Sequence, residues 1–136
     1  MSTTLVVGLG CQRGCTANLL RELIEQNLQA HGVAIDAITA LASIDHKSTE
    51  PGLLELAVQL NLPLVFLSAA ELADVEALLS HRSALAFAHT GCHGVAESAA
   101  LALAQRLAGR PVKLLINRQK NQYATFALAG DVPNRR

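Results

Sequence analysis

The chain has 136 residues, about half of them apolar, which suits one domain with a buried core. Eleven basic and eleven acidic residues cancel, and the only aromatic residues are three phenylalanines and one tyrosine, so neither nucleic acid nor an anionic membrane is an expected partner. Met1–Thr4 carries no basic flank and the apolar run Leu5–Leu9 is too short for a signal peptide or membrane span, which predicts a cytoplasmic protein.

The first predicted element is a buried strand, Leu5–Leu9, because this short β-branched run leads into a glycine-rich loop. Thr16 is then a suitable N-cap for a helix that ends near His31-Gly32. The apolar residues between them recur at helical spacing and comprise Leu20, Leu23, Ile24 and Leu28.

The middle of the chain repeats this order of strand, loop and helix. Ile38–Ile44 predicts a second strand, and the polar stretch Asp45–Glu50 leads to a helix that begins at Pro51. Leu64–Leu67 predicts a third strand, after which the capping box formed by Ser68 and Glu71 begins a helix through about Leu79.

The last part of the chain predicts one buried helix and two strands. Val95–Leu107 is apolar nearly all round, as expected for a buried helix, and Gly109-Arg110-Pro111 ends it. The remaining predicted segments are a loop or short strand at Ser83–His89, a turn at Gly91–Gly94, strands at Val112–Ile116 and Tyr123–Leu128, and a polar loop at Asn117–Gln122 between them.

This alternation predicts a three-layer α/β/α fold with a largely parallel sheet and a C-terminal β-hairpin. Residues 1–130 are expected to form one domain, and Asp131–Arg136 a frayed tail. In such sheets ligands bind beyond the carboxyl ends of the strands, where the loops of interest should meet.

The loop from Gly8 to Cys15 is the first candidate site. It follows a strand and precedes a helix, so main-chain amides and the positive helix end would face an anion, and Arg13 would grip a carboxylate or phosphate. Its glycine spacing matches neither the dinucleotide fingerprint nor a P-loop. The alternative is that Gly8, Gly10 and Gly14 only permit a tight turn and close packing.

The second strand-to-helix connection is expected beside that loop. Asp45 and Glu50 are candidates for acid, base or hydrogen-bond acceptor, and Lys47 for an anion contact. The alternative is that both acids cap the helix beginning at Pro51 while Lys47 is solvated. Ser43 lies at the end of the preceding strand.

The thiol and imidazole side chains are of the types that bind soft metals. The spacing between Cys11 and Cys15 does not match common zinc patterns, so no metal site is predicted and buried thiols are favoured. Cys11 is also a candidate nucleophile, because a helix N-terminus lowers the pKa of a nearby thiol. No histidine lies close to it in the sequence to act as its base. The other such residues are His89, Cys92 and His93.

The start of the buried helix and the final hairpin carry the remaining candidate residues. Gly94 and Glu97 occupy the helix start, where Glu97 lines a pocket or simply answers the helix dipole. Lys113, Arg118 and Lys120 make the hairpin locally positive, although solvated surface residues are the alternative.

Four stretches taken together resemble the CobE family, which is similar to the C-terminal domain of CbiG in cobalamin biosynthesis. They are Gly8–Gly14, Ser43–Gly52, Gly94–Leu101 and Ala124–Ala127, within a match from about Leu5 to Ala129. At Arg118–Gln122 the chain departs from a stretch that is richer in lysine and glycine in the family. The resemblance implies a role in building the corrin ring, with a carboxylate-rich tetrapyrrole as ligand.

The leading hypothesis is therefore a protein that binds or carries a precorrin or corrinoid, without a required cofactor. The resemblance also implies two alternatives: hydrolysis of a cobalt-precorrin lactone with acetaldehyde release, as in full-length CbiG, and an accessory module for another corrin-pathway enzyme. In the hydrolase, Asp45 or Glu50 would do the acid–base work. The expected ligand-binding residues are Gly8, Gly10, Cys11, Arg13, Gly14, Ser43, Asp45, Lys47, Gly94, Glu97 and Lys120.

Overall fold

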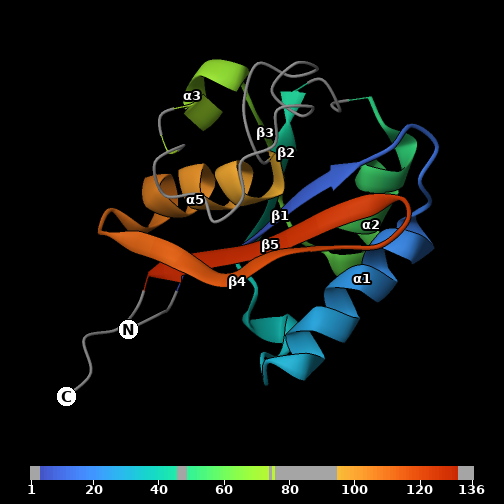
Figure 1. Ribbon diagram of the computed structural model, residues 1–136, viewed down its shortest axis with the longest axis horizontal. Helices are drawn as coiled ribbons and strands as arrows, with labels where there is room; N and C mark the ends of the chain where they lie inside the picture. The colour runs from blue at the N-terminus through green and yellow to red at the C-terminus, as the bar shows by residue number, and fades with distance from the viewer. Residues whose placement is uncertain (1–3, 46–48, 74, 76–94, 132–136) are drawn as a thin grey trace.

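The computed structural model describes residues 4–45, 49–73, 75 and 95–131. They form a five-stranded sheet of order β3-β2-β1-β5-β4, in which β1 to β3 are parallel and the last two strands form an antiparallel hairpin (Figure 1). The strands are β1 Leu5–Cys11, β2 Ala40–Ile44, β3 Leu64–Leu67, β4 Val112–Lys120 and β5 Ala124–Asp131. The predicted fold class is confirmed.

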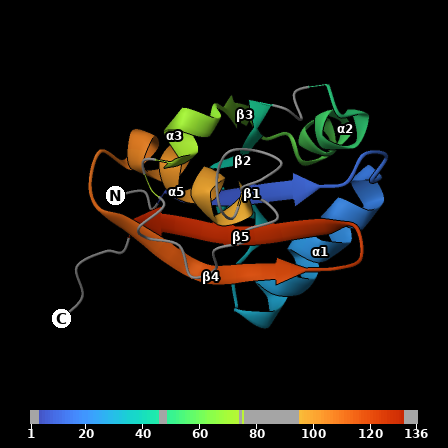
Figure 2. The ribbon, with the colours of Figure 1, turned by 45° about the horizontal axis from the view of Figure 1, so that its top comes forward.

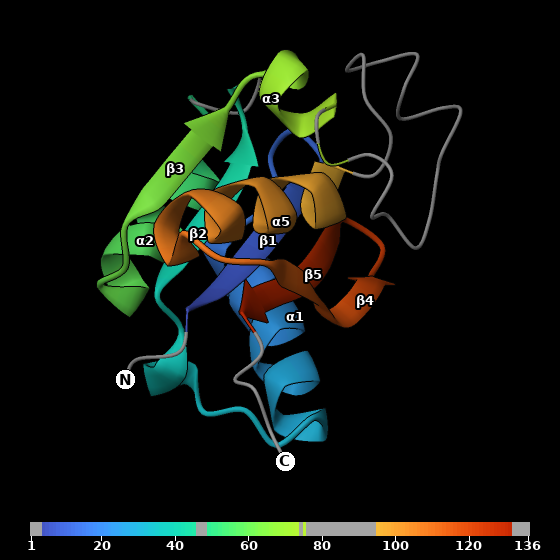
Figure 3. The ribbon, with the colours of Figure 1, turned by 90° about the vertical axis from the view of Figure 1, so that its left-hand side faces the viewer.

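Helices cover both faces of the sheet, as Figure 3 shows with α5 in front and α1 behind. One apolar cluster joins α1 and α2 to Val7, Leu9 and Phe126 of the sheet, and a second joins α3 and α5 to the opposite face. The helices are α1 Ala17–Ala30, α2 Pro51–Leu60, α3 Ala69–Ala73 and α5 Val95–Ala108, with a short 3-10 helix at Ile35–Ala37.

The predicted helix caps form as expected. The Thr16 hydroxyl accepts a hydrogen bond from the Leu19 N–H at 3.2 Å, and Gly32 adopts a positive φ of 70° after α1. Ser68 and Glu71 exchange the two bonds of a capping box. Hydrogen bonds from Ser68, led by its main-chain N–H, hold the pKa of Glu71 below its usual value.

Several predicted boundaries are wrong. β1 continues to Cys11, β2 begins at Ala40, and β4 continues to Lys120, so the expected polar loop Asn117–Gln122 is mostly strand. The end of the predicted α3, the segment Ser83–His89 and the turn before Val95 lie outside the described residues.

The frayed tail was expected from residue 131, but Asp131 is the last residue of β5 and is buried. Its carboxylate accepts a hydrogen bond from the Thr4 N–H at 2.6 Å and pairs with Arg110 at 3.0 Å. This acid therefore ties the last strand to the residue before β1 and to the segment after α5.

Candidate functional site

Helix starts and strand ends meet at one edge of the sheet. β4 runs parallel to β1, because both are antiparallel to β5. The carboxyl ends of β1, β2, β3 and β4 therefore lie at the same edge, where α1, α2 and α5 begin (Figure 2). We refer to it below as the carboxyl edge.

The loop after β1 is a tight turn from Gln12 to Cys15. The Cys15 N–H donates to the Gln12 carbonyl at 3.1 Å, and Gly14 has a φ of 83°, a conformation that favours glycine. Arg13 is exposed within this turn. The Gln12 N–H donates to the Tyr123 carbonyl at 2.9 Å, so the turn lies against the end of the β4–β5 hairpin.

Gly8 and Gly10 are strand residues and not part of this loop. Gly8 pairs with Ala42 on one side and Ala127 on the other, and a Cβ there would lie 1.9 Å from the Ala96 carbonyl of α5. A Cβ on Gly10 would lie 2.7 Å from the Thr125 hydroxyl. The packing interpretation therefore describes Gly8 better than direct contact with a ligand.

The main-chain amides of the turn are already engaged by the protein. Glu50 is buried, and its Oε2 accepts a hydrogen bond from the Gly14 N–H at 2.9 Å. The Gln12 and Cys15 amides donate to carbonyl groups. The expectation of open amides facing an anion is thus wrong for these three groups, because the carboxylate of Glu50 occupies the Gly14 amide.

The capping alternative for Glu50 is also wrong. Glu50 is the N-cap residue of α2, but its side chain makes no capping hydrogen bond and reaches the first loop instead. Asp45 lies exposed just beyond β2. Lys47, between these two acids, lies outside the described residues.

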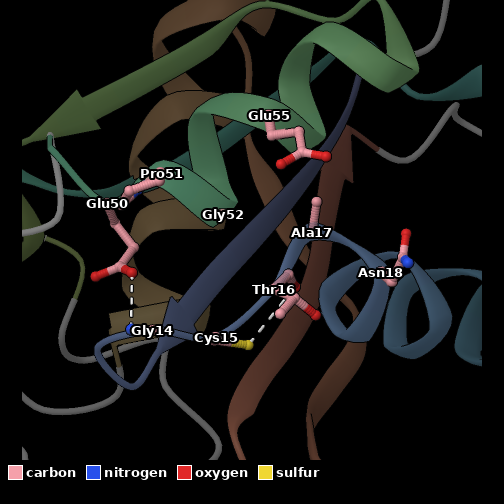
Figure 4. A pocket seen from close by; sticks show the side chains of 9 residues that line it. All are labelled: Gly14, Cys15, Thr16, Ala17, Asn18, Glu50, Pro51, Gly52 and Glu55. Carbon is pink, nitrogen blue, oxygen red and sulfur yellow. Dashed lines mark hydrogen bonds between the residues drawn. The ribbon is translucent and has the colours of Figure 1, made fainter.

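An open hollow of about 490 Å³ separates the first turns of α1 and α2. Figure 4 shows Glu50 and Gly14 at one end and Glu55 and Asn18 at the other. Of the predicted site residues that the structure describes, Gly14 and Glu50 line it. Among the described residues, its lining contains two carboxylates and no basic side chain.

Gly52 makes this hollow narrow at its base. A Cβ on Gly52 would lie 2.0 Å from the Cys15 carbonyl oxygen, so the backbones of the two helix starts are in close contact. Gly52 was not among the predicted site residues. The sequence signal that marks Gly52 is its place in the first turn of a helix. Helix propensity disfavours glycine there, so a glycine at such a position usually indicates close approach of another backbone.

Cys15 is buried, and that burial raises the pKa of its thiol, with the Glu50 carboxylate adding to the effect. The thiol is therefore held in its neutral form and is unsuited to act as a nucleophile. Cys11, at the end of β1, is only partly buried.

We expect the alkylation rate of Cys15 by iodoacetamide to reach half its maximum at a higher pH than that of free cysteine. In Glu50→Gln this midpoint should move to lower pH, because the nearby negative charge that opposes the thiolate is gone. Mass spectrometry of the Cys15 peptide measures the rate separately from the other cysteines. A midpoint that stays the same or rises in Glu50→Gln would contradict this role of Glu50.

Two other predicted site residues have structural partners. The hydroxyl of Ser43, which is fully buried, donates to the Leu9 carbonyl at 2.7 Å and joins β2 to β1. Glu97 is also fully buried in the first turn of α5, where its Oε2 accepts from the Arg118 N–H at 2.8 Å. Neither side chain lines the surface of the edge.

The remaining predicted residues divide into two groups. Lys120 is exposed at the end of β4, at the carboxyl edge. Gly94 lies outside the described residues, as do His89, Cys92 and His93. Within the described ranges, no three His, Cys, Asp or Glu residues are grouped so that they could hold a metal ion.

The arginines of the described ranges fall into two classes by their partners. Arg21 pairs with Glu25, Arg106 with Glu71 and Arg110 with Asp131. Arg13 and Arg118 have no acidic partner in the part of the chain that the structure describes. Arg13 lies in the turn after β1 and Arg118 near the end of β4, so both are at or near the carboxyl edge. Lys120, the last residue of β4, also lies there and has no acidic partner among the described residues.

No helix among the described residues is long and apolar enough to cross a bilayer.

Comparisons with known proteins point to one family. A family model described as cobalamin synthesis G C-terminus matches residues 5–129. Protein CobE of Sinorhizobium sp is 40% identical over 126 residues, which cover 93% of this chain and 79% of that protein. The cobalt-precorrin-5A hydrolase of Priestia megaterium is 34% identical over 97 residues, which cover 71% of this chain but only 25% of the hydrolase.

Similar solved structures point to the same family. The crystal structure of CobE, described as a protein from the cobalamin (vitamin B12) biosynthetic pathway, superposes with a TM-score of 0.94 at 46% identity and covers 99% of this chain and 95% of its own. The cobalamin biosynthesis protein chiG from Agrobacterium tumefaciens str. C58 gives 0.72 at 28% identity, with coverage of 93% and 97%.

Proposed function

The chain belongs to the cobalamin synthesis G C-terminal family, and on that premise we propose that it binds a carboxylate-rich tetrapyrrole, a precorrin or corrinoid, at the carboxyl edge. The observation that carries the proposal is the group of basic side chains there without acidic partners in the described residues: Arg13, Arg118 and Lys120.

The chemistry of these groups suits such a ligand. A guanidinium binds a carboxylate through two parallel hydrogen bonds, and a ring with several carboxylates offers one to each cation. The net charge of the chain is zero, so attraction must come from local groups. Hydrogen bonds from Gln12 to the hairpin turn hold the Arg13 turn against the end that carries Lys120.

We expect Arg13→Ala to weaken the binding of cobyrinic acid, a corrinoid with free carboxylates, by about 1.5 kcal/mol, or roughly tenfold, because one charge-assisted contact is lost. Titration followed by visible absorption measures the affinity. Arg21→Ala is the matched control, since Arg21 pairs with Glu25 on α1. Equal affinities in the two variants would remove Arg13 from the site, and a wild-type protein that binds no cobyrinic acid would overturn the proposed function.

A second candidate is the hydrolysis of a cobalt-precorrin lactone, favoured by the similarity to cobalt-precorrin-5A hydrolase. Glu50 is the side chain suited to act as a base: it lines the hollow between α1 and α2, and the Gly14 N–H holds one of its oxygens. The chain spans a quarter of that hydrolase.

Release of acetaldehyde from a lactone-bearing cobalt-precorrin distinguishes the two candidates. Under the binding proposal the protein releases none above the uncatalysed rate. Sustained turnover that Glu50→Gln abolishes would replace the binding proposal with the hydrolase.

A further inference from the structure

The strand β4 is irregular near the carboxyl edge. Its pairing with β5 shifts between Leu114 and Ile116, and again between Ile116 and Gln119. Each shift breaks the regular two-residue alternation, which is how β-bulges re-aim side chains next to binding sites. Arg118 lies within the second irregular stretch.

A buried carboxylate holds this irregular stretch in place. Glu97, fully buried in α5, accepts a hydrogen bond from the main-chain N–H of Arg118 at 2.8 Å. A buried charge is costly unless it is hydrogen-bonded, so the bond to the Arg118 N–H stabilises the Glu97 carboxylate. It ties the backbone of Arg118 to the first turn of α5, which packs over Gly8.

Lys120 and Arg118 both lie on the α5 side of the sheet. Lys120 pairs with Thr125, Thr125 pairs with Gly10, and the Thr125 hydroxyl lies 2.7 Å from the position that a Cβ of Gly10 would take. Paired residues share a face, and that face of Gly10 also looks toward Val95 of α5. Regular alternation does not pass through the irregular stretch, but the hydrogen bond from the Arg118 N–H to Glu97 brings this residue to the start of α5, the side on which Lys120 lies.

Arg118 is also the half-buried member of the unpaired cations, whereas Arg13 and Lys120 are exposed. A guanidinium that has lost part of its water gains more from a carboxylate than an exposed one does. The main chain of Arg118 is anchored, yet its side chain has no acidic partner among the described residues.

We propose, on the premise of the function proposed above, that Arg118 binds a side-chain carboxylate of the tetrapyrrole and that Glu97 is the positioning residue that holds it for that contact. Glu97 itself does not touch the ligand. Lys120 stands beside Arg118 on the same face and adds a second positive charge. The subsite therefore recognises ligands that carry free carboxylates.

The first test compares cobyrinic acid with its fully methylated ester, in which no carboxylate is free. Arg118→Ala should weaken binding of the acid at least about tenfold, the effect of one lost charge-assisted hydrogen bond, and leave binding of the ester unchanged. Lys113→Ala is the matched control, since Lys113 is an exposed cation near the opposite end of β4. It should leave both affinities unchanged.

The second test separates positioning from a general structural role of Glu97. Glu97→Ala should weaken binding of the acid but not of the ester, and Glu97→Gln should restore most of the affinity because its amide oxygen still accepts from the Arg118 N–H. Equal losses for acid and ester in Glu97→Ala would show damage to the fold alone and overturn the positioning role.

The outcomes for the two proposals differ. Wild-type protein that binds neither ligand would overturn the proposed function and this subsite with it. Wild-type protein that binds the acid, with Arg118→Ala indistinguishable from Lys113→Ala, would overturn the subsite and leave the proposed function standing.

Discussion

Gly8→Ala should lower the free energy of unfolding by about 3 kcal/mol or more, at the upper end of the cost of overpacking a core. A Cβ at this position would lie 1.9 Å from the Ala96 carbonyl oxygen and 2.8 Å from the Ala100 nitrogen, both in the backbone of α5. Relief therefore requires the whole helix to move from the sheet. Urea unfolding followed by circular dichroism measures the change.

Gly32→Ala is the matched control for Gly8→Ala. Gly32 has a φ of 70°, but an added Cβ meets no atom within 4 Å, so only the left-handed conformation is strained, at a cost of about 1 kcal/mol. The double variant Gly8→Ala with Ala100→Gly should recover little, because the Ala96 carbonyl remains. Equal losses in the Gly8 and Gly32 variants would contradict the close contact of α5 with β1.

Gly52→Val should cost about 3 kcal/mol or more as well, for a different contact. Its Cβ would lie 2.0 Å from the Cys15 carbonyl oxygen, so α2 and the first loop cannot keep their separation. Gly52→Ala should cost less, since alanine regains up to about 1 kcal/mol of helix propensity over glycine. Thermal unfolding ranks the two variants against the wild type.

The Gly52 variants also report on the loop itself. Separation of α2 from Cys15 should expose the buried thiol, so iodoacetamide should modify Cys15 faster in Gly52→Val at a fixed pH. Val58→Ala is the control, because Val58 is 80% exposed on the same helix. An unchanged Cys15 rate together with full stability in Gly52→Val would contradict the contact.

Local sequence signals predicted the helix ends well where the interaction that forms them lies within a few neighbouring residues. Thr16, Gly32 and the Ser68–Glu71 pair were identified because a cap satisfies main-chain groups of its own helix. The end of β4 was missed, because polar residues such as Asn117 and Gln119 favour a loop locally, whereas pairing with β5 extends the strand.

The candidate site was predicted less completely, because its contacts join distant residues. The first loop was identified as an anion site, yet Glu50, 36 residues away, occupies the Gly14 amide. Glu97 was expected at the ligand, but it is fully buried against the Arg118 backbone. Arg118 was predicted only as one of the basic residues of the hairpin, since the sequence does not show which basic side chains have an acidic partner.

The sequence by itself determined the order of strands and helices, the α/β class and the family, because caps, periodicity and motif order act over a few neighbouring residues. Only the tertiary structure decided which glycines permit close backbone contact and which carboxylates satisfy amides from other elements. It also decided which cations stay unpaired at the carboxyl edge. Such roles depend on contacts between residues far apart in the chain, as between Gly8 and Ala96 or between Gly52 and Cys15.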